Sequence, residues 1–350
     1  MTVLVTGGAG YIGSHMVCEL VDAGERVVVL DNLSTGFAWS VAPGVPLVVG
    51  DVGDQELVAR LIRQHHVEAI IHFAASIVVP DSVREPLAYY RNNTVNSRAL
   101  FECAVRNGVR HFIFSSTAAV YGNPAEVPVS EDTPTQPISP YGSSKLMSEI
   151  MLRDAGRAHG LGYVILRYFN VAGADPHSRS GQSGTESTHL IKVAVETALG
   201  LRPKIEVFGT DYPTPDGSCI RDYIHVSDLV RAHADALRHL RSGLPSLTLN
   251  CGYGRGYSVL AVIDSVKRVS GIDFRVDTAP RREGDPAQIV ADTQRIRATL
   301  GWQPRFDDLA TIAAHALAWE RELMRRRTAA RDHSDQRAPV GVATAGSDRP

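Results

Sequence analysis

Short apolar runs alternate with stretches of helical periodicity through the first 170 residues of the chain. Apolar runs bounded by turn residues predict strands, and an apolar side chain every three or four positions predicts a helix. We therefore expect strands at 3–6, 27–30, 46–49, 69–73, 111–116 and 163–168. We expect helices at 12–21, 54–65, 86–107 and 141–159. This alternation indicates an α/β fold with a doubly wound parallel sheet that has helices on both faces.

The pattern changes after about residue 170, where polar, glycine-rich stretches separate mixed elements. Helices are expected at 190–199, 226–240 and 259–270 and from 292 and 307, with strands at 205–208, 247–250 and 274–277. We interpret 1–170 as a nucleotide-binding domain and 171–327 as mainly a smaller, mixed α/β substrate-binding region. A ligand would lie between them, at the carboxyl ends of the strands. Residues 328–350 lack apolar periodicity, which predicts a disordered tail.

The candidate cofactor site begins with a glycine turn at Gly7, Gly10 and Gly13, between the first predicted strand and helix. Glycines allow the tight turn, and backbone N–H groups at a helix N-terminus favour a pyrophosphate. Asp31 ends the second predicted strand, 18 positions after Gly13, where a carboxylate can bind both ribose hydroxyls. A carboxylate would repel a 2′-phosphate, so this Rossmann-type site favours NAD over NADP.

Composition narrows the class of protein. The 350 residues are 44% hydrophobic and 21% charged, and the net charge of −2 argues against nucleic acid or a membrane surface as a partner. The four cysteines form no Cys-x-x-Cys pair, so neither a metal site nor a disulfide framework is expected. No signal peptide and no run of 18 apolar residues is visible. We expect a cytoplasmic enzyme with free thiols.

Tyr141 and Lys145 are the candidate catalytic pair. If a helix starts near Pro140, their i,i+4 spacing places both side chains on one face. A nearby ammonium stabilises a phenolate and lowers its pKa, so a tyrosine in such a pair can act as a base near neutral pH. Pairs of this kind are common on solvated helices, and the preceding glycine turn is what favours catalysis. Gly-x-x-Gly-x-x-Gly followed by Tyr-x-x-x-Lys is typical of the short-chain dehydrogenase/reductase superfamily.

Further motifs carry a closer resemblance, which extends from Val3 to about Arg321. They are GGAGYIG (7–13), DNL (31–33), HFAA (72–75), FSST (114–117), YGSSK (141–145), LRYFN (166–170), RDYIHV (221–226) and RREGD (281–285). With them the chain resembles the UDP-glucose 4-epimerase (UDP-galactose 4-epimerase) family, in the extended branch of that superfamily. The resemblance implies an isomerase of galactose and nucleotide-sugar metabolism. It would interconvert UDP-glucose and UDP-galactose by reversible oxidation at sugar C4, through a 4-keto intermediate, with tightly bound NAD regenerated in each cycle.

The resemblance also implies residue roles. Tyr141 would take the proton from the sugar 4-hydroxyl, and Lys145 would lower the pKa of Tyr141 and bind the nicotinamide ribose. Thr117 would hydrogen-bond the sugar oxygen and relay the proton. Further cofactor contacts are expected at Gly7, Gly10, Tyr11, Ile12, Gly13, Asp31, Asn32, Asp51, Val52, Phe73, Ala74, Ala75, Asn92 and Phe169. Further substrate contacts are expected at Asn170, His189, Leu190, Glu206, Val207, Phe208, Arg221, Arg282, Glu283, Gly284, Asp285 and Ile289.

The chain departs from the family at three positions that bear on the substrate or the cofactor. Ile77 stands where some members place a lysine near the cofactor, and His189 stands where an asparagine is often found. Ile289 occupies the position at which a tyrosine restricts the pocket to glucose and galactose and a small residue admits N-acetylated sugars. We expect isoleucine to leave a UDP-N-acetylhexosamine as a poor but measurable substrate.

Several alternatives stay open at this point. A nucleotide-sugar 4,6-dehydratase is disfavoured because Ala118 and Ala119 follow Thr117, where those relatives have Asp-Glu. An epimerase of another UDP-sugar, such as a pentose or N-acetylhexosamine, an NAD-linked dehydrogenase or reductase, and a nucleotide-sensing module are the others. The family also implies a homodimer, in which the helices at 86–107 and 141–159 pair across a two-fold axis.

Overall fold

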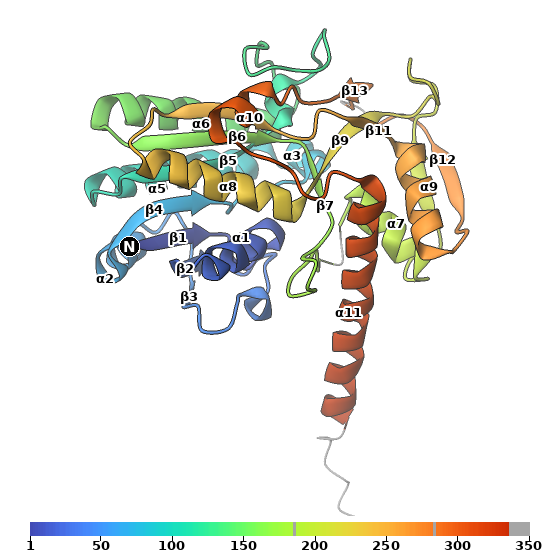
Figure 1. The fold of residues 1–350 in the computed structure, drawn as a ribbon, viewed down its shortest axis with the longest axis horizontal. Coiled ribbons are helices and arrows are strands. Elements are labelled where there is room, and N and C mark those ends of the chain that lie inside the picture. Colours follow the sequence, from blue (N-terminus) through green and yellow to red (C-terminus); the bar gives the residue numbers. More distant parts are fainter. Residues whose placement is uncertain (185–186, 283–284, 336–350) are drawn as a thin grey trace, which may run out of the picture.

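Seven parallel strands form the main sheet of the protein, in the spatial order β10-β6-β5-β4-β1-β2-β3. The structure is a computed structural model that describes residues 1–184, 187–282 and 285–335 (Figure 1). The strands are β1 (Thr2–Thr6), β2 (Arg26–Asp31), β3 (Leu47–Val49), β4 (Val67–His72), β5 (His111–Thr117), β6 (Gly162–Tyr168) and β10 (Leu247–Cys251). Each pair of neighbours runs parallel, so all carboxyl ends meet at one edge of the sheet.

The two faces of this sheet bury different side chains of the same strands. In β1, Val3 and Val5 pack into one apolar cluster and Leu4 packs into the other. The first cluster lies under α1 (Tyr11–Asp22) and α8 (Val226–Arg241), and the second under α2 (Gln55–His65), α5 (Asn96–Arg106) and α6 (Pro140–His159). Because successive strand side chains point to opposite faces, near-continuous apolar runs are what a sheet covered on both sides requires. The predicted doubly wound α/β fold is confirmed.

Short elements connect these layers. The connection after β2 contains one 3₁₀ turn, η1 (Ala38–Ser40), and the chain after β5 forms another, η3 (Ala118–Tyr121). The single helix expected at 86–107 is instead α4 (Pro86–Tyr89), a π-helical turn η2 (Tyr90–Val95) and α5. An additional helix, α3 (Val79–Arg84), precedes α4 and was not expected.

Most of the later part of the chain forms a separate layer, at the right of Figure 1. Helices α7 (Leu190–Ala198), α9 (Val259–Ser270) and α11 (Leu309–Asp335) pack together there. Strands β8 (Ile205–Phe208) and β12 (Val276–Ala279) form one small sheet, and β7 (Asn170–Ala172), β9 (Ile220–His225), β11 (Gly256–Ser258) and β13 (Gln288–Ile289) form another. Helix α10 (Gln294–Leu300) contacts α8 and β10.

Two expectations about this later part differ from the structure. The strand expected at 247–250, assigned to the substrate region, is β10 at the edge of the main sheet, paired with β6. The tail was expected to be disordered from residue 328, but α11 continues to Asp335. The alanines and arginines of this stretch are good helix formers, which explains how a helix continues without apolar periodicity. The rest of the predicted tail, 336–350, lies outside the described residues.

Candidate active site

The glycine turn after β1 is built so closely that side chains would not fit. Gly7 has φ +70°, and a Cβ there would lie 2.6 Å from the backbone nitrogen of Ala74. A Cβ on Gly13 would lie 2.1 Å from the carbonyl oxygen of Gly7. Gly10 is the N-cap of α1, and among the described residues no side chain caps that helix. Its first N–H groups are therefore available to an anion, as the pyrophosphate of a dinucleotide requires.

Asp31 lies beside this turn, at the end of β2. Its Oδ2 accepts from the backbone N–H of Ala9 at 2.9 Å, and its Oδ1 accepts from that of Leu33 at 2.8 Å. These bonds hold the carboxylate in one orientation, and each oxygen keeps a second acceptor position. The arrangement fits the role expected for Asp31 toward the hydroxyls of a ribose.

Asp51 and Asn92 are held in the same way by neighbouring polar groups. Asp51 Oδ1 accepts from Gly53 N at 2.8 Å and from the Asn96 amide at 2.9 Å. The Asn92 amide donates to Ser76 Oγ at 2.9 Å. Val52 and Ala74 contribute to the apolar cluster under α2, α5 and α6, whereas Tyr11 donates its hydroxyl to the carbonyl of Gly173 at 2.7 Å, and Ile12 packs on the opposite cluster.

Tyr141 and Lys145 are both on α6 and both buried, with 8% and 3% of their surface exposed. Ser139 caps this helix, since its Oγ accepts from the Gly142 N–H at 3.2 Å. The Lys145 ammonium donates to the carbonyl oxygen of Ser115 at 2.9 Å and lies 4.9 Å from the centre of the Phe114 ring. The helix thus places the pair against β5, at the carboxyl edge of the main sheet.

The electrostatics of this pair differ from the expectation. Burial raises the pKa of Tyr141 to about 12, and a hydrogen bond with the Thr117 side chain opposes part of that increase. Burial lowers the pKa of Lys145 to about 8, although Glu149 raises it. The expected lowering of the Tyr141 pKa by Lys145 is therefore absent from the causes in this structure, because desolvation dominates and the ammonium is directed to the Ser115 carbonyl.

Thr117 ends β5 and faces the same region. Its Oγ1 accepts from the Ala119 N–H at 3.1 Å, which caps η3, and it keeps a hydroxyl proton to donate. Phe73 and Ala75 follow β4, and the Phe73 ring lies 4.9 Å from that of His233 on α8. The structure thus brings the glycine turn, Thr117 and the tyrosine–lysine pair to one edge of one sheet.

A buried ion pair beside the catalytic pair was missed by the sequence analysis. Glu149 is one helical turn after Lys145, and its carboxylate accepts from Arg167 Nη2 at 2.6 Å and from Arg167 Nε at 3.0 Å. Ser116 also donates to it. Because both members are almost fully buried, the pair fixes α6 against β5 and β6. The signal was the continuation of the Tyr141–Lys145 spacing to a third position on the same helical face.

The expected diphosphate contacts lie on different elements of the smaller region. Arg221 is on β9, and its Nη2 lies 3.5 Å from Asp285 Oδ1. The guanidinium of Arg282 stacks on Phe208, 3.7 Å from the ring centre. Glu206 forms an ion pair with Lys204, and the side chain of Val207 is buried in the main apolar cluster. Val207 therefore contributes packing rather than a side chain for a ligand. Glu283 and Gly284 lie outside the described residues.

The remaining substrate candidates surround the start of α7 and a third apolar cluster. His189 precedes Leu190 at the N-terminus of α7 and hydrogen-bonds Gln182, and burial lowers the pKa of its imidazole. Asn170 begins β7 and pairs with Tyr223 of β9. Ile289 packs in one cluster with Phe169.

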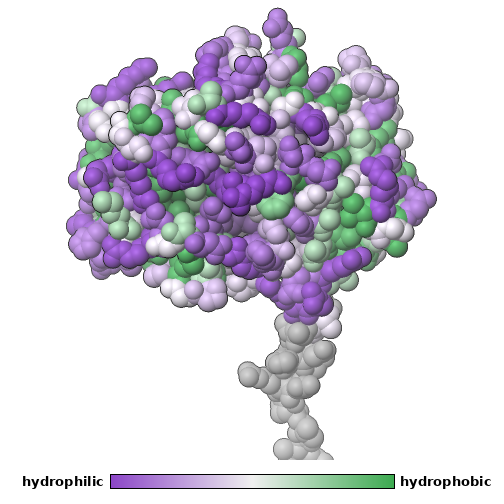
Figure 2. Space-filling model, in the orientation of Figure 1, coloured by the Kyte–Doolittle hydropathy of each residue, from purple (hydrophilic) through white to green (hydrophobic). Residues whose placement is uncertain are grey.

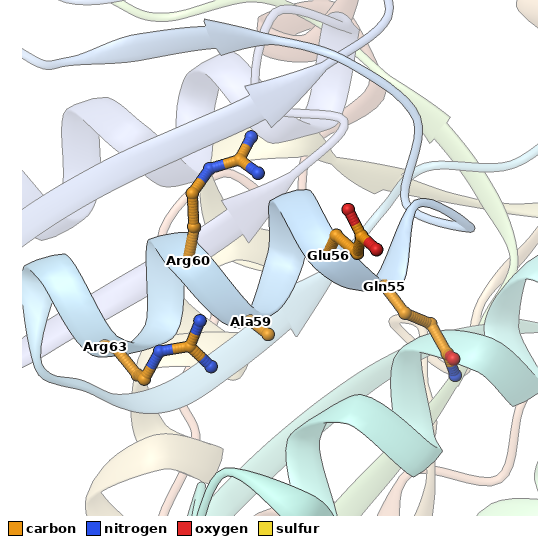
Figure 3. A pocket seen from close by; sticks show the side chains of 5 residues that line it. All are labelled: Gln55, Glu56, Ala59, Arg60 and Arg63. Atoms are coloured by element: carbon orange, nitrogen blue, oxygen red, sulfur yellow. The ribbon is translucent and has the colours of Figure 1, made fainter.

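Surface hollows do not mark this site. Figure 3 shows one on α2, lined by Gln55, Glu56, Ala59, Arg60 and Arg63, whose side chains spread from one helix and do not converge. None of the five is a predicted site residue. Among the described residues, no group of three or more His, Cys, Asp and Glu side chains is placed to hold a metal ion. Nor does any helix in the described ranges have the length and apolar character needed to cross a membrane.

Comparison with known proteins agrees with this geometry. Residues 3–252 match the NAD dependent epimerase/dehydratase family, and the chain belongs to that family. It is 59% identical over 321 residues to a UDP-glucose 4-epimerase of Azospirillum brasilense, covering 92% of each chain. The structure of UDP-glucose 4-epimerase from Brucella ovis in complex with NAD is 43% identical, with a TM-score of 0.88, covering 91% of this chain and 97% of that one. The UDP-Glc/GlcNAc 4-epimerase of Campylobacter jejuni is 47% identical, with a TM-score of 0.80 and 92% and 99% coverage.

Proposed function

We propose that this protein is an isomerase that interconverts UDP-glucose and UDP-galactose, by reversible NAD-dependent oxidation at sugar C4 through a 4-keto sugar. One observation carries the proposal above all. A buried tyrosine–lysine pair lies against the strand that ends in Thr117, at the same sheet edge as a glycine turn suited to a dinucleotide. The identity to curated UDP-glucose 4-epimerases over nine-tenths of the chain supports the substrate.

The residues present fit NAD. The N–H groups at the start of α1 would hold its pyrophosphate, Asp31 its adenosine ribose, and Lys145 its nicotinamide ribose. NAD, when bound, takes up the hydrogen of sugar C4 with its electron pair and returns it to the opposite face. Its positive charge in the oxidised form also favours the phenolate of Tyr141, which burial alone disfavours.

The chain itself supplies the proton transfers. Tyr141 takes the proton of the 4-hydroxyl as C4 is oxidised and gives it back when C4 is reduced. Thr117, whose hydroxyl hydrogen-bonds with Tyr141, positions the same sugar oxygen. The Lys145 ammonium, fixed on the Ser115 carbonyl, keeps a positive charge near this site. Burial of all three side chains excludes water, which protects a reactive 4-keto sugar.

Net dehydrogenation and dehydration are less well supported. Ala118 and Ala119 are the residues that follow Thr117, so no carboxyl group is supplied there for elimination at C5 and C6. A net dehydrogenase would have to release reduced cofactor after each turnover.

The experiment is to incubate purified protein with UDP-galactose without added NAD and to identify the products by nuclear magnetic resonance. We expect conversion to a constant ratio of UDP-galactose and UDP-glucose, and NAD recovered from the denatured protein. A stoichiometric need for added NAD would indicate a dehydrogenase, and a 4-keto-6-deoxy product would indicate a dehydratase.

A second substrate class has its own support. Ile289 is buried beside Phe169 in the third apolar cluster, where its side chain is smaller than a tyrosine. The similar protein from Campylobacter jejuni is described as acting on both UDP-Glc and UDP-GlcNAc. We therefore expect a slower epimerisation of UDP-N-acetylglucosamine, which an assay with that sugar nucleotide tests directly.

We also propose a homodimer. Helices α3, α4, η2 and α6 pack against one another, and Val83, Leu87, Val95, Met147 and Ile150 expose apolar side chains from them, Leu87 with 80% of its surface. The face over α8, shown in Figure 2, is instead mainly hydrophilic, with small separate apolar patches. Contiguous exposed apolar residues indicate an interface, and a two-fold pairing of these helices would cover them.

A cytoplasmic location is the last part of the proposal. All four cysteines are buried free thiols, which suits a reducing compartment. Cell fractionation with an antibody to the protein tests this location.

A further inference from the structure

The connection between β2 and β3 lies directly on the glycine turn. The N–H of Phe37 donates to the carbonyl of Ala9 at 2.9 Å, and Ser40 Oγ donates to the same oxygen at 2.7 Å. A Cβ on Gly36 would lie 2.8 Å from the carbonyl carbon of Ala9. This loop starts at Asp31, so its two ends are a cofactor residue and a segment bound to the turn. Opening it would disturb both.

The outer side of the loop is held by the C-terminal helix. Trp39, 48% exposed, stacks on the buried Trp319 of α11, with ring centres 6.3 Å apart and planes at 25°. The Arg326 guanidinium lies 5.7 Å from the Trp39 ring and 5.0 Å from the Trp319 ring. Arg326 is itself fixed by Glu322 at 2.8 Å and by the Ser178 carbonyl at 3.3 Å.

We propose that Trp39, Trp319 and Arg326 form an aromatic latch, by which α11 holds the loop closed over the dinucleotide site and slows the release of NAD. The three are positioning residues, since they act through the loop and touch none of the reacting atoms. The inference rests on the proposed function for the identity of the dinucleotide. It goes beyond that function by assigning cofactor retention to residues almost 300 positions apart in the sequence.

The physical reason is that a ligand under a closed segment leaves through states in which the segment is open. An aromatic pair stabilises the closed state by an amount that corresponds to about two- to twelvefold in an equilibrium constant. The guanidinium over both rings adds to this at a partly exposed site. An epimerase that regenerates its NAD in each cycle gains from such retention, because release between the two half-reactions would abort the cycle.

The test is the rate at which bound NAD exchanges for etheno-NAD, followed by fluorescence without any sugar nucleotide. We expect Trp39→Ala to exchange about two- to twelvefold faster than the wild-type protein. Trp39→Phe, which keeps a ring for stacking, should restore most of the slow exchange. Arg326→Ala should accelerate exchange in the same sense. Arg325→Ala is the matched control, because Arg325 pairs with the same Glu322 yet projects into solvent, and its exchange should equal that of the wild type.

Wild-type exchange in both Trp39→Ala and Arg326→Ala would overturn the latch, as would equal acceleration in Trp39→Phe and Trp39→Ala. If Trp39→Ala does not fold, the comparison of Arg326→Ala with Arg325→Ala decides alone. Because no sugar is present, the result is independent of the reaction. Accelerated exchange in a protein without epimerase activity would contradict the proposed function and leave the latch standing.

Discussion

Replacing Lys145 by methionine should abolish most activity and yet make the NAD-free protein more stable at pH 7. Burial lowers the pKa of this ammonium from 10.5 to about 8, so the folded protein binds the proton less readily than the unfolded chain. A difference of about 2.5 in pKa corresponds to roughly 3 kcal/mol by which the charge destabilises the fold below pH 8. Methionine has a similar length without the charge.

The net gain is smaller, because the ammonium also makes favourable contacts. Losing the hydrogen bond to the Ser115 carbonyl costs about 1 kcal/mol, and losing the contact with the Phe114 ring costs about 0.5–1 kcal/mol. We therefore expect the free energy of unfolding of Lys145→Met to exceed that of the wild type by about 1–2 kcal/mol at pH 7. Turnover should fall by at least about 10²-fold.

The pH dependence gives the decisive comparison. Between pH 8 and 10.5 the folded protein loses the Lys145 proton while the unfolded chain keeps it, so wild-type stability rises with pH over this interval. The advantage of Lys145→Met should accordingly shrink by pH 9.5. Urea unfolding of both proteins at pH 7 and 9.5 measures this. Lys267→Met, at a lysine that pairs with Asp273 near the surface, should change stability by less than about 1 kcal/mol at either pH. A less stable Lys145→Met at pH 7, or an advantage that grows with pH, would refute the reasoning.

Three further outcomes are expected. Tyr141→Phe should lower turnover at least about 10²-fold with the protein still folded, and near-normal turnover would end the proposed mechanism. Protein stripped of nucleotide should regain activity with NAD far better than with NADP, and equal recovery would contradict the role of Asp31. Ile289→Tyr should abolish activity on UDP-N-acetylglucosamine and spare UDP-glucose, whereas Ile289→Ser should raise the former; an unchanged ratio in both would show that Ile289 is not the gate. Leu87→Glu should convert a dimer to a monomer in light scattering, while Ile272→Glu, at a similarly exposed apolar residue outside those helices, should not.

The sequence by itself determined those features that depend on local periodicity. Buried parallel strands read as apolar runs, so the strands of the first 170 residues were predicted to within a few positions. The Gly7 turn was equally legible, because only glycine fits where a Cβ would meet backbone atoms. The spacing of Tyr141 and Lys145 needed only a helix to place both on one face.

The tertiary structure alone decided which elements meet. The run that forms β10 reads the same in either sheet, and its place beside β6 depends on where α8 packs. The pKa values of the catalytic pair follow from burial, which no i,i+4 spacing reveals. The contact of Trp39 with Trp319 joins a loop of the nucleotide-binding part to the last helix. Local patterns report neighbours along one element, whereas desolvation and stacking across the chain depend on the relative positions of many elements, and only the packed fold defines those positions.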